Sequence, residues 1–167
     1  MLNNKSFLAV IPARAGSKRL PNKNRLPLAG KPLIQWTIEA AQASAFVDSI
    51  VVSSDDDTIL SVAKKMGVVA QNRPGDLATD VANSADCVAY VLKQMSHQYD
   101  YLVLLQPTSP LRTSVDIDAA INKAIDCAAE SVTTVTEVEH SPLWANTLPA
   151  DGSFAGFIKP ALSLIHI

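Results

Sequence analysis

The chain is poor in the residues that mark disulfide-rich, metal-binding and membrane proteins. It has 167 residues with two cysteines, and aromatic residues make up 5% of it. Cys87 and Cys127 lie in apparent helices at no spacing typical of a metal site, so we expect reduced core thiols in a cytosolic protein. No apolar run approaches the roughly 18 residues that span a membrane. The first residues do not resemble a signal peptide, because their short apolar stretch runs into arginines.

Acidic residues are absent from residues 1–31, although seven of the 14 Lys and Arg lie there. The net charge of the whole chain is −2, which gives no reason to expect nucleic acid or a membrane as a partner. The apolar run 7–11 leads into this basic segment, where the small residues Ala15, Gly16 and Ser17 would let backbone N–H groups approach an anion. The spacing fits neither the G-x-x-x-x-G-K-[ST] nor the G-x-G-x-x-G phosphate loop. We predict a loop that binds a polyanion; the alternative is a basic loop that is merely solvated.

Strand-like and helix-like segments alternate along the chain. The hydrophobic patterns predict strands at 7–11, 49–53, 68–70, 101–105 and 132–135, and helices at 33–43, 58–66, 84–95 and 115–128. In the helix at 84–95 the inward positions would be Val88, Val91, Leu92 and Met95. Apolar strands between helices are typical of an α/β fold with a mostly parallel sheet covered on both faces. Ligands of such folds bind beyond the carboxyl ends of the strands, which here are followed by the polar loops 12–31, 54–57, 71–84 and 106–112.

Three of these loops leave alternatives open. Arg73 offers a planar fork for a base carbonyl or a carboxylate, and Ser84 either contacts a ribose hydroxyl or caps the next helix. Asp80 is as well explained as a loop-bracing residue. The segment 106–112 presents an amide and hydroxyls between prolines, which suits a polyhydroxylated substrate; the alternative is a rigid turn that caps a helix. The run 55–57 fits a metal site less well than a capped helix start.

Four collinear motifs resemble the acylneuraminate cytidylyltransferases, also called CMP-sialic acid synthetases. They are IPARAGSKRLPNKN, VVSSDD, RPGDLATD and LLQPTSPLR, within a similarity that covers roughly residues 6–145. The resemblance implies a Rossmann-like three-layer α/β sandwich of the nucleotide-diphospho-sugar transferase type. It implies a cytoplasmic enzyme of lipopolysaccharide or capsule biosynthesis, homodimeric at full length. The reaction implied is transfer of CMP from CTP to a nine-carbon 2-keto sugar acid, with Mg²⁺ and release of pyrophosphate.

The resemblance also assigns roles by position. Catalysis falls to Lys23 and Arg14. The nucleotide would be bound by Arg14, Gly16, Ser17, Lys18, Lys23, Asn24, Arg73 and Ser84. The sugar acid, a nonulosonic acid, would be bound by Gln106, Thr108 and Ser109. No metal ligand is assigned within the chain, so the Mg²⁺ ligands are expected mainly from CTP and from a missing C-terminal segment.

Further expectations concern the acceptor sugar, the extent of the domain and the activity of this chain. The eight-carbon branch, the 3-deoxy-manno-octulosonate cytidylyltransferases, typically has Ser-Thr-Arg and Lys-Pro in the first loop, whereas this chain has Ser17-Lys18 and Lys23-Asn24. This difference favours the nine-carbon branch, within which sialic, legionaminic and pseudaminic acids are not separated. Residues 1–161 would form a cytidylyltransferase domain that is incomplete at its C-terminus. Residues 162–167 are expected to be a non-native tail, because their sequence LSLIHI matches one reading frame of a common transposon-end sequencing adapter. Such a chain is expected to be weakly active or inactive, and an inactive nucleotide-binding fragment is the alternative from another class.

Overall fold

The computed structural model describes residues 2–17, 20–78, 83–139 and 150. The chain divides by its contacts into two compact units, residues 1–132 and 133–167. All the helices and strands described below lie in the first unit. The domain limits expected from the sequence, 1–161 and 162–167, remain predictions, because residues 151–167 lie outside the described part of the chain.

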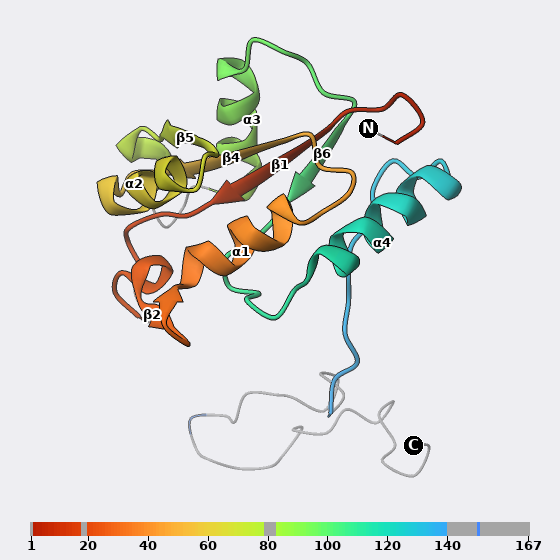
Figure 1. Ribbon diagram of the computed structural model, residues 1–167. Helices are drawn as coiled ribbons and strands as arrows, with labels where there is room; N and C mark the ends of the chain where they lie inside the picture. Colours follow the sequence, from red (N-terminus) through yellow and green to blue (C-terminus); the bar gives the residue numbers. More distant parts are fainter. Residues whose placement is uncertain (1, 18–19, 79–82, 140–149, 151–167) are drawn as a thin grey trace. The chain divides into compact units, whose positions relative to one another are not determined.

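A parallel four-stranded sheet forms the centre of the first unit (Figure 1). Its strands lie in the order β5-β4-β1-β6, and every pairing is parallel. Their bounds are β1 (Phe7–Pro12), β4 (Ser49–Ser54), β5 (Val69–Asn72) and β6 (Tyr101–Leu104). The chain builds outward from β1 to β4 and β5 and then returns to the other side of β1 for β6. The strand order therefore reverses between β1 and β6, and at such a point a parallel sheet opens a crevice for a ligand.

Helices cover the sheet from both sides, and this confirms the predicted Rossmann-like three-layer α/β fold. The helices are α1 (Leu33–Gln42), α2 (Asp57–Lys65), α3 (Ser84–Gln94) and α4 (Ser114–Asp126). On one face, Ala9 and Ile11 of β1 pack with residues of α1, α2 and α4. On the other, Leu8 and Val10 pack with Val91 of α3, which lies across the sheet from α1 and α4 (Figure 1).

Strand β1 is the most buried element, which explains why it reads as an unbroken apolar run. Five consecutive side chains, from Phe7 to Ile11, are at most 1% exposed. Successive strand side chains point to opposite faces, so a central strand between two helix layers must be apolar at every position. Each large side chain buried in this way stabilises the fold by about 1.5–3 kcal/mol. This rigid strand carries the first loop at its carboxyl end.

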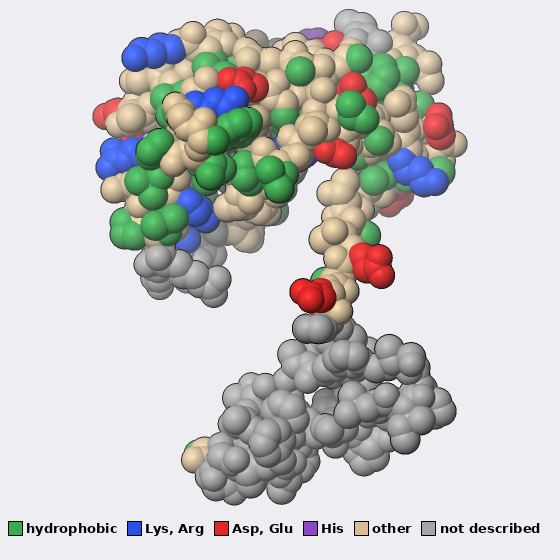
Figure 2. Space-filling model, turned by 60° about the horizontal axis from the view of Figure 1, so that its bottom comes forward, with side chains coloured by type: hydrophobic (Ala, Val, Ile, Leu, Met, Phe, Trp, Pro, Cys, Tyr) green, Lys and Arg blue, Asp and Glu red, His purple; other side chains and the backbone are tan. Residues whose placement is uncertain are grey.

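The segment between β1 and α1 contains short elements that the sequence did not predict. A 3-10 turn, η1 (Lys23–Arg25), is followed by a hairpin of β2 (Pro27–Leu28) and β3 (Lys31–Pro32). Ala29 and Gly30 join its strands with φ of 47° and 88°, and a tight hairpin turn of this kind requires positive φ at both positions. The leucines of this segment, Leu20, Leu26 and Leu28, are 38–48% exposed. Figure 2 shows hydrophobic side chains gathered among Lys and Arg on one face of the molecule.

Several local predictions were wrong. Residues 132–135 form no strand, because β-branched residues need a neighbouring strand to pair with. Leu92 is 45% exposed and α3 buries Cys87 instead. Cys127 is exposed and follows the last residue of α4, so only Cys87 is a core thiol. On the α3 face, Leu102 and Leu104 of β6 are 39% and 40% exposed, so the described helices do not cover that strand on both sides.

No helix among the described residues is both long and apolar enough to cross a bilayer.

Candidate nucleotide-binding site

A hollow of about 270 Å³ lies at the carboxyl ends of the strands, where the strand order reverses. Its walls come from the end of β1, the loop after β1, the segment between β5 and α3, and the loop after β6. The lining residues are Pro12, Arg14, Gly16, Ser17, Lys23, Asn24, Arg73, Leu77, Asn83, Ser84, Gln106, Pro107 and Thr108. Segments far apart in the sequence thus contribute cationic, amide and hydroxyl groups to one small space.

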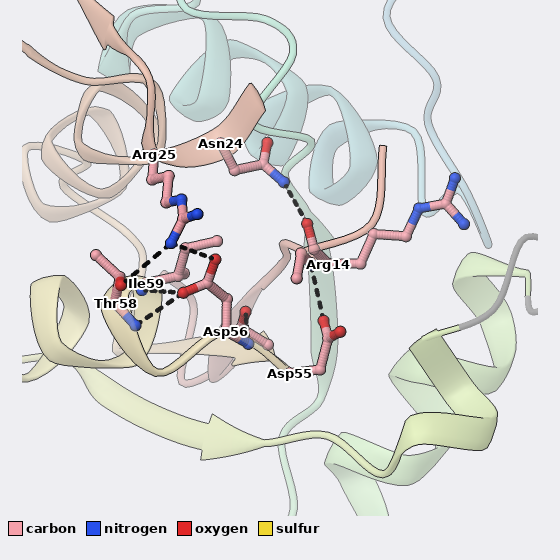
Figure 3. Close-up of polar contacts among 9 residues, drawn as sticks. Arg14, Asn24, Arg25, Asp55, Asp56, Thr58 and Ile59 are labelled. Carbon is pink, nitrogen blue, oxygen red and sulfur yellow. Dashed lines mark hydrogen bonds and ion pairs between the residues drawn. The ribbon is translucent and has the colours of Figure 1, made fainter. Parts of the chain in front are cut away.

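The first loop is fastened to the 3-10 turn η1 by Asn24. This side chain is buried, and its Nδ2 donates a hydrogen bond to the carbonyl oxygen of Arg14 at 3.1 Å (Figure 3). Its Oδ1 is also buried and has no hydrogen-bond partner among the described residues. Lys23 begins the same turn and lines the hollow together with Arg14. The loop therefore holds two cations and an unused amide oxygen at the mouth of β1.

Two carboxylates from the start of α2 brace this loop from below (Figure 3). Asp55 Oδ1 accepts a hydrogen bond from the Ala15 N–H at 2.9 Å. Asp56 is the N-cap of α2, and its side chain accepts hydrogen bonds from the N–H groups of Thr58 and Ile59. This confirms the capped helix start that the sequence predicted. Its Oδ2 lies 3.7 Å from Nη1 of Arg25 in η1. The sequence predicted that the Ala15 N–H could approach a bound anion. That prediction was wrong, because this N–H already donates its hydrogen bond to the Asp55 carboxylate.

Arg73 is the most buried cation of the hollow. It follows β5, its side chain is 6% exposed, and its N–H donates to the Ser54 carbonyl at 2.9 Å. Its Nη2 lies 3.8 Å from Asp55 Oδ1. Neither Nε nor Nη2 has a hydrogen-bond partner among the described residues. Buried polar groups are normally hydrogen-bonded, so this guanidinium is suited to a ligand that supplies the missing acceptors.

Ser84 lines the hollow but does not cap α3, so the capping alternative is wrong. The N-cap is Asn83, whose Oδ1 accepts from the Asp86 N–H at 2.8 Å, while Asp86 Oδ2 accepts from the Asn83 N–H at 3.3 Å. This reciprocal pair is a capping box, and it leaves the Ser84 hydroxyl at the first helical position. Contact of Ser84 with a ribose stays a prediction. Asp80 lies outside the described residues.

The loop after β6 is a turn that Arg112 holds in place. Its Nη1 and Nη2 each donate to the carbonyl oxygen of Gln106 at 3.4 Å, and Nη2 also donates to Thr37 Oγ1 of α1 at 3.1 Å. Burial lowers the pKa of the Arg112 guanidinium from its ordinary value. The Ser109 N–H donates to the same Gln106 carbonyl at 3.3 Å. The rigid-turn alternative is thus correct for the backbone, but the N-cap of α4 is Thr113, just beyond the loop.

The structure gathers most of the residues that the sequence assigned to binding. Nine of those eleven residues line the hollow. Lys18 lies outside the described part of the chain, and Ser109 is in the adjoining turn without lining the hollow. The sequence assigned no binding role to the lining residues Pro12, Leu77, Asn83 and Pro107, and it took Asp55 as part of a capped helix start or a metal site, not as a brace of the first loop. Asp55 had a signal, since it directly follows a buried strand at its ligand-binding end.

The hollow can bind an anion with a polar organic group attached. Arg14 and Lys23 lie on one wall and Arg73 on another, with the Gln106 amide contributed by the loop after β6. Within the described residues no three His, Cys, Asp or Glu side chains form a cluster that could hold a metal ion. The described side chains alone therefore do not fit a resident metal, and the positive charge of the site comes from Arg and Lys.

Comparison with known proteins agrees with this geometry. Residues 8–149 match the family model described as Cytidylyltransferase. The chain is 43% identical over 160 residues to the CMP-N,N'-diacetyllegionaminic acid synthase of Legionella pneumophila, covering 93% of this chain and 67% of the relative. It is 39% identical over 137 residues to a pseudaminic acid cytidylyltransferase of Campylobacter jejuni, covering 80% of this chain and 59% of the relative.

A solved structure shares the fold. It is a CMP:2-keto-3-deoxy-manno-octonic acid synthetase complexed with CTP, with a TM-score of 0.65 and 29% identity over 74% of this chain and 49% of that one. The chain is also 42% identical over 115 residues to an N-acylneuraminate cytidylyltransferase of Escherichia coli, in an alignment that covers 69% of this chain and 27% of that relative. The chain thus spans only part of the length of the relatives that it matches. The family match extends over most of the 167 residues. The chain therefore belongs to the cytidylyltransferase family.

Proposed function

We propose that this chain carries the nucleotide site of an enzyme that transfers CMP from CTP to a nine-carbon 2-keto sugar acid and releases pyrophosphate. The observation that carries the proposal is the hollow at the β1–β6 switch point, which collects Arg14, Lys23, Arg73 and Gln106 from three separate loops. The family and the names of the relatives support the same class of reaction.

The roles follow from the place of each side chain. Arg14, Gly16, Ser17 and Lys23, with Lys18 beside them in sequence, bind the triphosphate at the carboxyl end of β1. Asn24 holds this loop through its bond to the Arg14 carbonyl, and its buried Oδ1 is available to accept a hydrogen bond from a hydroxyl of the nucleotide or from a water. Arg73 and Ser84, on the opposite wall, bind the cytidine. Gln106, Thr108 and Ser109 bind the sugar acid from the loop after β6.

The reaction is an in-line displacement at the α-phosphorus. The oxygen of the anomeric hydroxyl forms the new bond to the α-phosphorus and its proton passes to solvent water, while the bond between the α-phosphorus and the oxygen that bridges to the β-phosphorus breaks and releases pyrophosphate. Negative charge grows on the phosphoryl oxygens and on the departing pyrophosphate, so positioned cations stabilise the transition state more than the ground state. Lys23 and Arg14 supply this charge, with Lys23 as the main catalytic residue.

Three further properties belong to the proposal. Mg²⁺ is the proposed cofactor, and its ligands would come mainly from the oxygens of CTP, since Mg²⁺ in such sites is held by few carboxylates together with substrate phosphates. The described side chains form no cluster of acidic, histidine or cysteine residues that would hold the metal. The full protein is a homodimer and works in the cytoplasm, where CTP is available.

Within the nine-carbon class, an acid of the sialic acid type is the first candidate for the acceptor sugar and legionaminic acid is the second. Of the relatives compared, the legionaminic acid synthase matches 93% of this chain at 43% identity. An eight-carbon acceptor is less well supported, since a 3-deoxy-manno-octulosonate cytidylyltransferase of Bdellovibrio bacteriovorus is 34% identical over 72% of the chain. Pseudaminic acid is a third acceptor within the same class.

Pyrophosphate release tests the proposal. The protein is incubated with CTP, Mg²⁺ and each of sialic, legionaminic, pseudaminic and 3-deoxy-manno-octulosonic acid, with UTP in place of CTP as the control. Release that needs both CTP and a nine-carbon acid is the expected result. Binding of CTP without release would instead support the inactive nucleotide-binding fragment. Absence of CTP binding would contradict the nucleotide site itself.

A further inference from the structure

Asp55 lies between the two walls to which the proposed function assigns the two halves of CTP. It directly follows β4, whereas Ala15 belongs to the loop after β1 and Arg73 follows β5. We propose that Asp55 is a positioning residue that couples the triphosphate loop to the cytidine-binding Arg73. This inference rests on the proposed function and adds to it a link between the phosphate and base sites.

A single carboxylate oxygen makes both contacts. Asp55 Oδ1 accepts the Ala15 N–H at 2.9 Å and lies 3.8 Å from Arg73 Nη2. Figure 3 shows the side chain directed at the backbone beside Arg14. The first distance is that of a good hydrogen bond, whereas the second is an ion pair without one. Movement of the Asp55 side chain would therefore disturb both loops together.

On the Arg73 side, Asp55 supplies charge without using up donors. The Arg73 side chain is 6% exposed, and a buried charge needs a counter-charge. The Asp55 side chain, 25% exposed, provides it from just outside hydrogen-bond distance. Arg73 Nε and Nη2 consequently keep their N–H groups unused among the described residues. The guanidinium is oriented but still able to donate to a base carbonyl.

On the loop side, Asp55 fixes the backbone at the point where the lining residues begin. The Ala15 N–H is tied to Asp55 and the preceding Arg14 carbonyl is tied to Asn24. These two bonds hold both sides of the peptide unit between Arg14 and Ala15, so the backbone is fixed where the loop enters the hollow. The negative charge of Asp55 also keeps phosphate away from Ala15. The triphosphate is thereby left to the donors further along the loop.

Two substitutions separate the two contacts. Asp55→Asn keeps an oxygen that accepts from Ala15 but removes the charge facing Arg73. We expect it to weaken CMP and CTP binding equally, by up to about fivefold, because Asp55 is partly exposed and its charge on Arg73 is partly screened by solvent. Asp55→Ala removes both contacts, so it should weaken CTP by a further factor of about three without a further loss for CMP. Asp57→Asn, an exposed neighbour in the first turn of α2, is the matched control and should change neither affinity.

Calorimetric titration of CMP and CTP into each variant, combined with Arg73→Met, decides the matter. If Asp55 acts through Arg73, Asp55→Asn causes no further loss of CMP affinity in the Arg73→Met background. Additive losses, or an Asp55→Asn variant that binds like the wild type, would overturn the coupling and leave the proposed function intact. A wild-type protein that binds neither nucleotide would overturn both. Should Asp55→Ala not fold, the isosteric Asn variant and the double variant still give the answer.

Discussion

At the scale of single residues, Arg73 is placed where its unused N–H groups can bind a ligand, although its burial does little to stabilise the fold. The guanidinium is buried, and two of its nitrogens have no hydrogen-bond partner among the described residues. Its ion pair with Asp55 is long, at 3.8 Å. Replacing a buried ion pair by apolar side chains is often neutral to stability, whereas removing one partner is harmful when it leaves the other charge buried. Here the partner left behind would be Asp55, whose side chain is 25% exposed and can be hydrated. Incomplete pairing of this kind is typical of a binding site.

Arg73→Met is therefore expected to weaken CTP binding without unfolding the protein. Met keeps the length of the side chain and removes the buried charge, so the melting temperature should stay equal to that of the wild type or rise. CTP affinity should fall at least about tenfold, the usual effect of losing hydrogen bonds to a charged group. Thermal unfolding and calorimetric titration measure the two effects. Lys93→Met, at the exposed end of α3, is the control; a strongly destabilised Arg73→Met that still binds CTP would refute this interpretation.

At the scale of elements, the beginning of α2 supports the nucleotide loop. Asp56 caps the helix through two backbone N–H groups and lies 3.7 Å from Arg25 of η1, the turn that also contains Lys23. Its side chain is only 6% exposed. The cap thus has two functions, since it satisfies the end of α2 and anchors the turn that presents the cation.

Asp56→Ala should lower the free energy of unfolding by about 1–2 kcal/mol, the usual effect of removing an N-cap. Asp56→Asn should keep most of that stability, because Asn caps as well as Asp, but it loses the charge opposite Arg25. Urea unfolding of both variants, with Asp57→Ala as the control in the same turn, measures the difference. Equal losses for Asn and Ala would show that the ion pair, not the cap, stabilises this end of α2.

Asp100 joins β1 and β6 at their amino ends, away from the site. Hydrogen bonds from the Ser6 N–H, from Lys5 Nζ and from the Ser6 hydroxyl hold the pKa of the Asp100 carboxyl at about 2, against an ordinary value of 3.8. A carboxyl whose pKa is lower in the folded state stabilises the fold above its unfolded pKa. That stabilisation is lost as the pH falls through the folded value.

Asp100→Asn should accordingly have a lower melting temperature than the wild type at pH 7 and at pH 5. The difference should shrink between about pH 4 and the folded pKa of about 2 and disappear below it, because the wild-type carboxyl is then protonated too. Melting curves of the two proteins over this range, compared pairwise, cancel the effects of the other carboxyls. A difference that does not change with pH would mean that Asp100 acts through packing alone.

At the scale of the whole molecule, the sequence predicted the sheet and most of the candidate residues that line the hollow. The runs of β1 and β4 are buried on both faces, so their composition is almost enough to identify them. Residues 132–135 have a similar composition but no strand partner within the described part of the chain, and a local sequence pattern does not show which strands will pair. In the same way, Asp55 gains its role from a contact with another loop, which no local pattern shows, and Leu92 is exposed because α3 covers only part of the sheet.

The central claim is that the basic loop after β1 binds the phosphates beyond the α-phosphate of CTP. Calorimetric titration of CTP and CMP into the wild type, Lys23→Ala and Lys65→Ala tests it most directly, since Lys65 is an exposed lysine at the end of α2. Lys23→Ala should weaken CTP binding by at least about tenfold and CMP binding much less, because CMP lacks the outer phosphates. Lys65→Ala should bind both like the wild type. Unchanged CTP affinity in Lys23→Ala, or an equal loss for CMP and CTP, would contradict the account.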